Sequence, residues 1–234
     1  MAQDSGHKND DGVELSEEEI KEAQRLEAKR KAKQKEVLDS KDKLFGAALA
    51  DLDLAGLDLQ NANLAKANLS HTNLSETNLS NANLIEVDLT GADLSKADLH
   101  DAYSPDAQWV AVNLSGADLR WVDFSWAVLS EANFTEANLL EVDFTEATLV
   151  ASDFTRANLS GVNFNNANLI DARLTGADLS KTLNLSPEQV ESAELDRATQ
   201  LPPYLEIEWK GKGDYEVRKK IEKKTKRKKT KKKS

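Results

Sequence analysis

The stretch Asn61–Leu84 reads NANLAKANLSHTNLSETNLSNANL and places a leucine at every fifth position. This register runs from Leu49 to Leu179, where 25 of 27 slots are Leu or Phe and only Ser104 and Trp109 depart. An α-helix would rotate successive leucines by about 140°, and a straight strand would send them to opposite faces. The leucines share one side only if the chain bends once in every five residues.

The residues around the leucines indicate how many bends complete one turn. A small residue lies two positions before each large one, so each unit contains a minimal strand, and turn-forming residues occupy the remaining corners. Val122, Val142 and Val162 recur every twenty residues, each two positions before a phenylalanine. This spacing favours four units per coil, and stacked coils of this kind form a solenoid with four walls.

Units such as ANLAK, ADLSK and ANFTE resemble the repeats of the pentapeptide-repeat family, in particular its bacterial and cyanobacterial members. The resemblance covers residues 47–181 and implies an all-β solenoid, a right-handed quadrilateral parallel β-helix. The segment LSPEQVESAELDRATQLP, residues 185–202, is similar to the short helix and Leu-Pro extension that end other members. Ser186, Pro187 and Gln189 fit a capping box with a first-turn proline, so a capping helix is expected over about 187–197.

Composition divides the chain into four parts. Residues 1–44 form a charged N-terminal arm with a helix expected at about 16–38, because Ser16 and Glu19 make a capping box. Residues 45–183 form the repeat. Residues 184–209 are expected to be a C-terminal cap, and residues 210–234 a disordered lysine-rich tail.

The overall composition excludes several classes of function. The 234 residues carry a net charge of −10 and contain no cysteine, so disulfides and cysteine-bound zinc are excluded. The sequence shows neither an apolar leader nor a run long enough to span a bilayer, and a cytoplasmic protein is expected. Inward positions are aliphatic or aromatic, and no nucleophile–base pair, phosphate loop or metal cluster is visible. A non-enzymatic protein without a cofactor or metal is therefore predicted.

The repeat predicts a protein-interaction or scaffold module, because one wall loses its polar outward residues. The apolar outward positions near this wall are Val110, Trp126, Val128, Val150 and Ile170, and a smaller spot combines Trp121 and Leu140. A contiguous exposed apolar surface usually contacts another molecule or another segment of the same chain. The hypothesis is a protein partner, most simply a second copy in a homodimer. The alternative is that the chain's own LPPYLEIEW segment or N-terminal helix covers the wall.

A second function follows from the family resemblance, since some members inhibit DNA gyrase by imitating DNA. Residues 45–181 carry 20 carboxylates along a tube of about 32 Å, a linear density close to that of B-DNA. The carboxylates divide almost evenly among the walls, 4, 5, 6 and 5, and six basic residues interrupt them. This distribution favours simple solubility over a DNA-mimicking modulator of a topoisomerase or another DNA-binding protein.

The C-terminal tail is strongly basic. Such runs bind nucleic acid, anionic lipid or an acidic protein surface, and here the acidic solenoid of the same chain is a further candidate. The basic residues of the proposed tail site are Arg218, Lys219, Lys220, Lys223, Lys224, Lys226, Arg227, Lys228 and Lys229.

Overall fold

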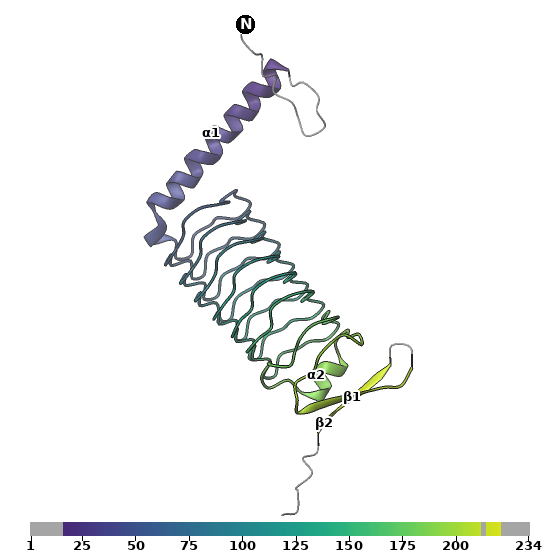
Figure 1. Cartoon of the computed structure of the whole chain (residues 1–234). Helices are drawn as coiled ribbons and strands as arrows, with labels where there is room; N and C mark the ends of the chain where they lie inside the picture. Colours follow the sequence, from purple (N-terminus) through teal and green to yellow (C-terminus); the bar gives the residue numbers. More distant parts are fainter. Residues whose placement is uncertain (1–15, 212–213, 221–234) are drawn as a thin grey trace, which may run out of the picture.

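The computed structural model describes residues 16–211 and 214–220 (Figure 1). A long helix, α1 (Glu17–Asp39), and a short 3-10 turn (Lys41–Lys43) precede the repeat. Stacked coils follow, and then come helix α2 (Pro187–Glu191) and the strands β1 (Leu205–Trp209) and β2 (Tyr215–Lys219). Figure 1 shows α1 at one end of the stack and α2 with the two strands at the other.

Each coil pairs with the next through parallel bridges between residues twenty positions apart. One such ladder runs through Asn83, Tyr103, Asp123 and Asp143. The amide of Phe124, for example, donates to the carbonyl of Asp143 at 2.9 Å. Four five-residue units therefore complete one coil. Each unit contributes only one bridge to a wall, which is why long strands are absent from the described part of the repeat.

The large residue of almost every unit points inward and is buried. The phenylalanines, the leucines and the small residues two positions before them form one continuous apolar core. In its second half the core is aromatic: Phe144 stacks between Phe124 and Phe164, with ring centroids at 5.6 and 5.8 Å. Burial of this apolar surface is the main force that holds the coils together.

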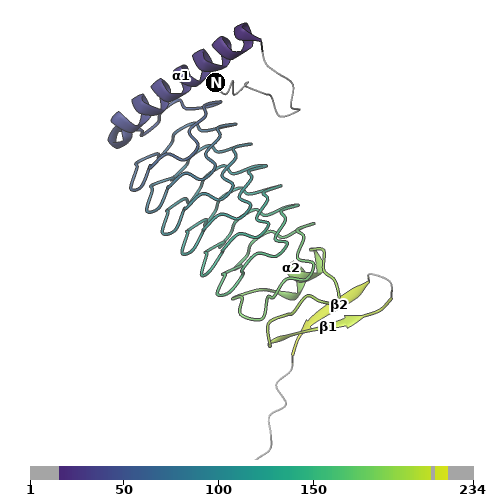
Figure 2. The same cartoon turned by 45° about the horizontal axis from the view of Figure 1, so that its top comes forward.

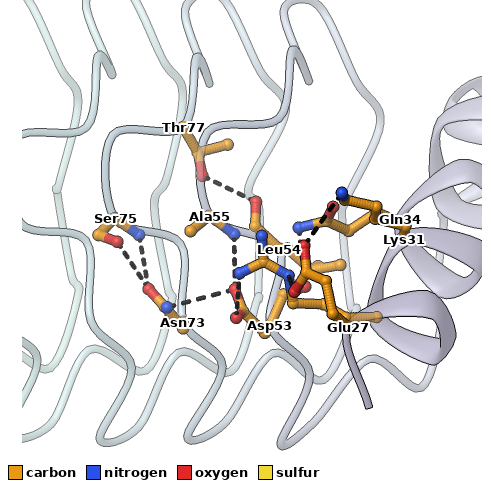
Figure 3. Close-up of polar contacts among 10 residues, drawn as sticks. Glu27, Lys31, Gln34, Asp53, Leu54, Ala55, Asn73, Ser75 and Thr77 are labelled. Carbon is orange, nitrogen blue, oxygen red and sulfur yellow. Dashed lines mark hydrogen bonds and ion pairs between the residues drawn. The ribbon is translucent and has the colours of Figure 1, made fainter. Parts of the chain in front are cut away.

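Asp or Asn closes most turns of the repeat by a local hydrogen bond. The side chain of Asp53 accepts from the amide of Ala55 at 3.2 Å, and that of Asn73 accepts from the amide of Ser75 at 3.1 Å (Figure 3). Both residue types supply the same acceptor oxygen, so the turn itself does not require a charge.

The corner residue of each unit adopts a left-handed backbone. Gly56, Gly91 and Gly116 have φ between 67° and 69°, and at other corners larger side chains occupy the same conformation. Side chains other than glycine pay a steric cost there, on the order of 1 kcal/mol.

Helix α1 begins at a complete capping box, since Ser16 and Glu19 each accept a hydrogen bond from the other's backbone amide. Its last turns pack on the first coil, where Val37 is buried. Arg30 Nη1 donates to the carboxylate of Asp53 at 2.9 Å. Gln34 Nε2 donates to the Asp53 carbonyl at 3.2 Å (Figure 3). The first turns are mostly exposed, and Figure 2 shows α1 crossing the end of the solenoid.

The expected C-terminal helix over 187–197 is too long. Helix α2 ends at Glu191, because Ser192 caps it and its hydroxyl donates to the Gln189 carbonyl at 2.9 Å. The chain then rejoins the solenoid: Glu194 pairs with Arg173, and Gln200 pairs with Asp178. The open edge of the last coil is thus partly satisfied by an irregular coil instead of a longer helix.

The expectation of a disordered tail from residue 210 is wrong for the residues that form β2. Strand β2 pairs antiparallel with β1 in the register Ile207 to Val217. Val217 is buried, and the Tyr215 hydroxyl donates to the Ala193 carbonyl at 2.6 Å. Alternating apolar residues give this basic segment one face that packs on α2. The cap therefore extends ten residues beyond the predicted boundary at Trp209, to Lys219.

Candidate interaction surfaces

One wall of the solenoid presents aliphatic side chains where other walls present polar ones. We call it the valine wall, and it comprises residues 48–51, 68–71, 88–91, 108–111, 128–131, 148–151 and 168–171, of which the second in each range is buried and the others face outward. Ile170 is 48% exposed, and Val110, Val128 and Val150 are half-buried. The slot that holds Val110, Val150 and Ile170 is occupied on the neighbouring wall by Ser115, Thr135, Thr155 and Thr175.

The aliphatic residues of the valine wall do not form a single file. Val128 bridges to Gln108 and Thr148, whereas Val110 and Val150 lie in the slot on the other side of the buried leucines. The amide of Glu131, next to Ser130, donates to the Val150 carbonyl at 2.8 Å, so Ser130 separates the two valines of that slot. The predicted strip is therefore a staggered patch two slots wide.

The two candidate coverings from within the chain lie elsewhere. Helix α1 contacts the first coil, and LPPYLEIEW, which contains β1, belongs to the hairpin at the opposite end (Figures 1 and 2). Among the described residues, neither flank lies along the valine wall. The wall is therefore open to solvent wherever the structure describes its neighbours.

The smaller apolar spot is divided by a cation. Trp121 is 44% exposed, and the Arg120 guanidinium lies 5.1 Å from its ring centroid. Leu140 is half-buried and occupies the same slot as Arg120, one coil further on. Trp121 and Leu140 are thus neighbours, but Trp121 already stacks against a charge.

The wall that follows Trp121 holds three exposed aromatic residues. The pattern of apolar residues in the sequence did not indicate that these three lie together. We call it the tyrosine wall. Its centre is the ladder Asn63, Asn83, Tyr103, Asp123, Asp143, Asn163 and Leu183. One corner carries Asp101, Trp121 and Glu141, and the other carries Asp106, Trp126 and Glu146. Tyr103 and Trp126 are 48% and 59% exposed, and Trp126 also borders the valine wall.

Each tryptophan of the tyrosine wall lies between two carboxylates in consecutive coils. The amide of Trp121 donates to the Leu140 carbonyl and that of Trp126 to the Thr145 carbonyl, which fixes each residue beside the corner of the next coil. The signal in the sequence was an acidic residue twenty positions before and twenty after each tryptophan. This spacing places the residues side by side only because four units complete one coil.

Within the described part of the chain, six carboxylates of the tyrosine wall have no cation close to them, as is also true of Asp51, Asp88, Glu131 and Asp171 on the valine wall. Among the described residues, none of Asp101, Asp106, Asp123, Glu141, Asp143 and Glu146 forms an ion pair within 4.0 Å. Other basic residues of the solenoid pair with carboxylates, as in Lys96–Glu76, Arg156–Glu136 and Arg173–Asp153, and Lys66–Glu86 does so at the corner that also carries Trp126. The six carboxylates of the tyrosine wall therefore remain uncompensated among the described residues.

Arg120 is the cation that contacts Trp121, and Asp118 holds it. Two donors of Arg120 bond to the Asp118 carboxylate, at 2.8 Å from Nε and 2.7 Å from Nη2. Partial burial raises the pKa of Asp118, but the bonds from Arg120 lower it by more, so its pKa lies below the ordinary value. The guanidinium is thus committed to Asp118 and to the face of Trp121.

The described residues also limit what other sites exist. They contain no group of three His, Asp or Glu side chains placed to hold a metal ion, and none of their helices is long and apolar enough to cross a membrane. Arg218 and Lys219, predicted as tail residues, lie in β2, where Arg218 bonds to Glu206 at 2.6 Å. Lys220 follows β2 directly. The remaining tail residues, Lys223, Lys224, Lys226, Arg227, Lys228 and Lys229, lie outside the described part.

A stack of four-unit coils with flat outer walls and an apolar interior defines a solenoid repeat protein. The chain belongs to the pentapeptide-repeat family: the model for pentapeptide repeats, with eight copies, matches residues 43–81, 72–103, 113–149 and 148–183. A search of curated protein sequences found no match.

Solved structures are similar to this chain. Full-length QnrB1, a plasmid-mediated fluoroquinolone resistance protein, is 18% identical with a TM-score of 0.53, over 70% of this chain and 88% of QnrB1. HetL, a pentapeptide repeat protein involved in heterocyst differentiation regulation from the cyanobacterium Nostoc, is 26% identical over 72% of this chain and 90% of HetL, with a TM-score of 0.33. The likeness to QnrB1 shows a shared solenoid fold.

Proposed function

We propose that this chain is a non-enzymatic, cytoplasmic protein-interaction module, and that the valine wall is its binding surface. The observation that carries the proposal is the run of aliphatic side chains in slots that hold Ser and Thr on the neighbouring wall. The repeat itself does not require them, because serine and threonine complete the same turn elsewhere. Covering this patch contributes about 25 cal/mol per Å² of apolar surface.

The simplest occupant is the valine wall of a second copy related by a two-fold axis. Flat walls of equal coil spacing, about 4.8 Å, bring side chains of two copies into register along their lengths. A two-fold contact uses the same patch on both chains, so one set of aliphatic residues serves both partners. Trp126, at the corner of the valine wall, supplies an aromatic edge of the kind common in interfaces.

The test is the mass of the protein in solution, measured by light scattering together with a thermal melt. Val128→Glu with Val150→Glu places charges in the contact and is expected to reduce a dimeric mass to that of a monomer. Asn133→Glu with Thr155→Glu is the matched control, because it adds the same charge to the two corresponding slots of the neighbouring wall. The control is expected to stay dimeric.

Two outcomes contradict this function. A monomeric wild type whose valine variant melts at an unchanged temperature means that the wall is simply exposed. A monomeric wild type whose valine variant is strongly destabilised means that a segment of the chain outside the described residues covers the wall.

A second candidate, the DNA-mimicking modulator, is supported by the tyrosine wall. Six carboxylates without a cation are the kind of surface that a DNA-binding protein would meet. QnrB1 is described as a fluoroquinolone resistance protein. Its likeness to this chain extends to the fold alone, so the gyrase function has to be tested by an assay. The even division of the carboxylates among the four walls still counts against a full decoy.

A further inference from the structure

We propose that the tyrosine wall is a docking surface for a lysine- and arginine-rich segment, and that its occupant is this chain's own C-terminal tail, residues 221–234. The inference does not rest on the aliphatic residues of the valine wall, although the two surfaces share the corner that carries Trp126. It rests on the arrangement of side chains on the tyrosine wall, on the backbone at its corners, and on the place where the tail leaves the cap.

The side chains of the tyrosine wall suit cationic groups. Trp121 and Trp126 each lie between two carboxylates, and the ladder between the two corners holds Tyr103, Asp123 and Asp143. Lysine and arginine gain from both parts of such a surface, through the faces of aromatic rings and through charge-assisted bonds to carboxylates. Trp121 already binds one guanidinium in this way, and among described residues the ring of Trp126 has no cation.

Folding does not account for the two tryptophans. Trp121 and Trp126 have φ of 61° and 63°, a backbone conformation that favours glycine and that is unusual for a bulky side chain. Their side chains are largely exposed, so they add little to the core. Because the other corners share this conformation, what singles out these two positions is a large exposed aromatic side chain, which points to recognition rather than to stability.

The cap delivers the tail to this wall. The amide of Lys220 donates to the Tyr204 carbonyl at 2.8 Å, which ties down the end of β2. Lys219 lines a groove together with Asn165, Leu183 and Leu185. Leu183 pairs with Asn163 in the ladder that continues to Asp143, Asp123 and Tyr103. The basic tail therefore starts at the end of the tyrosine wall.

Length and charge both match the wall. From Leu183 to Asp123 is three coils, or about 14 Å, whereas fourteen extended residues span about 46 Å. The tail holds nine Lys and Arg residues and one acidic residue, Glu222, against the six carboxylates without a cation. Because the tail is tethered, its local concentration at the wall far exceeds that of a free peptide.

The chain contains no cysteine, so a single label can be attached to the tail of the full-length protein. A spin label on Thr230→Cys broadens the amide NMR signals of residues near it. We expect the strongest broadening between residues 101 and 146 on the tyrosine wall and little on the valine wall. Salt at about 1 M, where the Debye length is about 3 Å, should remove it.

Charge-neutral variants provide the matched comparison. Asp101→Asn, Asp106→Asn, Glu141→Gln and Glu146→Gln together remove four carboxylates from the corners of the tyrosine wall and should abolish the broadening. The control replaces the four carboxylates of the valine wall, with Asp51→Asn, Asp88→Asn, Glu131→Gln and Asp171→Asn. It makes the same change in net charge and should leave the broadening unchanged.

A second variant keeps every charge and removes the rings. Trp121→Gly with Trp126→Gly suits the backbone of both corners and should weaken the broadening several-fold, while the amide spectrum reports an intact fold. Equal broadening on both walls, or an equal effect of the two charge variants, overturns the proposal. Broadening in a mixture of isotope-labelled and spin-labelled chains would assign the contact to a second copy, and overturn the own-tail occupant.

Discussion

The rings of Phe124 and Phe144 lie 5.6 Å apart and almost parallel, with an interplanar angle of 6°. They come from adjacent coils, twenty residues apart, and Phe164 continues the stack. Phe134 and Phe154 meet Phe144 edge-on, so each ring touches neighbours in its own and in adjacent coils. The aromatic half of the core is therefore a connected array in which one deletion leaves a cavity between four rings.

Phe144→Ala is expected to lower the free energy of unfolding by about 3–5 kcal/mol, because a fully buried ring is removed and rigid neighbours cannot fill the space. Denaturant melts measure this loss. Phe144→Leu is the control and should cost less than about 1.5 kcal/mol, since leucine occupies the same slot at Leu64 and Leu84. A loss below about 1 kcal/mol for the alanine variant would contradict the assigned core.

The two departures from the leucine register compensate each other. Trp109 is fully buried, and its indole Nε1 donates to the hydroxyl of Ser104 at 2.9 Å. Ser104→Ala is expected to cost about 1–3 kcal/mol, because it leaves a buried donor without an acceptor. Ser104→Ala in a Trp109→Leu background removes that donor as well and should cost less than in the wild type. Additive losses in the thermal melts of the double-mutant cycle would rule out coupling of the two residues.

The left-handed backbone at the corners leads us to predict that replacing Trp126 by glycine costs little stability. Trp126→Gly is expected to leave the free energy of unfolding within about 1 kcal/mol of the wild type, because glycine relieves the steric cost at φ 63°. Trp126→Ala retains that cost and should be less stable than the glycine variant by about 1 kcal/mol. Denaturant melts of the glycine and alanine variants measure this difference in stability. Alanine more stable than glycine would mean that the corner carries no strain.

The DNA-mimicking alternative predicts inhibition of gyrase supercoiling at stoichiometric concentrations. The test variant is the tyrosine-wall set, Asp101→Asn, Asp106→Asn, Glu141→Gln and Glu146→Gln, which should raise the inhibitory concentration. The valine-wall set is the control of equal charge. Asp98 and Asp118 are poorer targets, because His100 and Arg120 contact them. A lack of inhibition at large excess would remove the gyrase form of this function.

Much of the architecture could be predicted because the residues within each five-residue unit determine its conformation. The small residue, the Asp or Asn, the large apolar residue and the corner act within a few positions of one another, so local chemistry fixes the bend. The twenty-residue recurrence of Val122, Val142 and Val162 then indicated the size of the coil. The capping boxes that begin at Ser16 and Ser186 likewise predicted where both helices start, because each box needs only a partner side chain three residues further on.

The sequence alone determined the period, the coil, the buried positions and the location of the valines. The tertiary structure decided the length of the cap, because β2 exists only where Tyr215 and Val217 meet β1 and α2. It also decided which carboxylates lack a cation, since ion pairs join side chains twenty residues apart whose reach the pattern does not specify. The tyrosine wall emerged for the same reason: Tyr103, Trp121 and Trp126 become one surface only when adjacent coils stack.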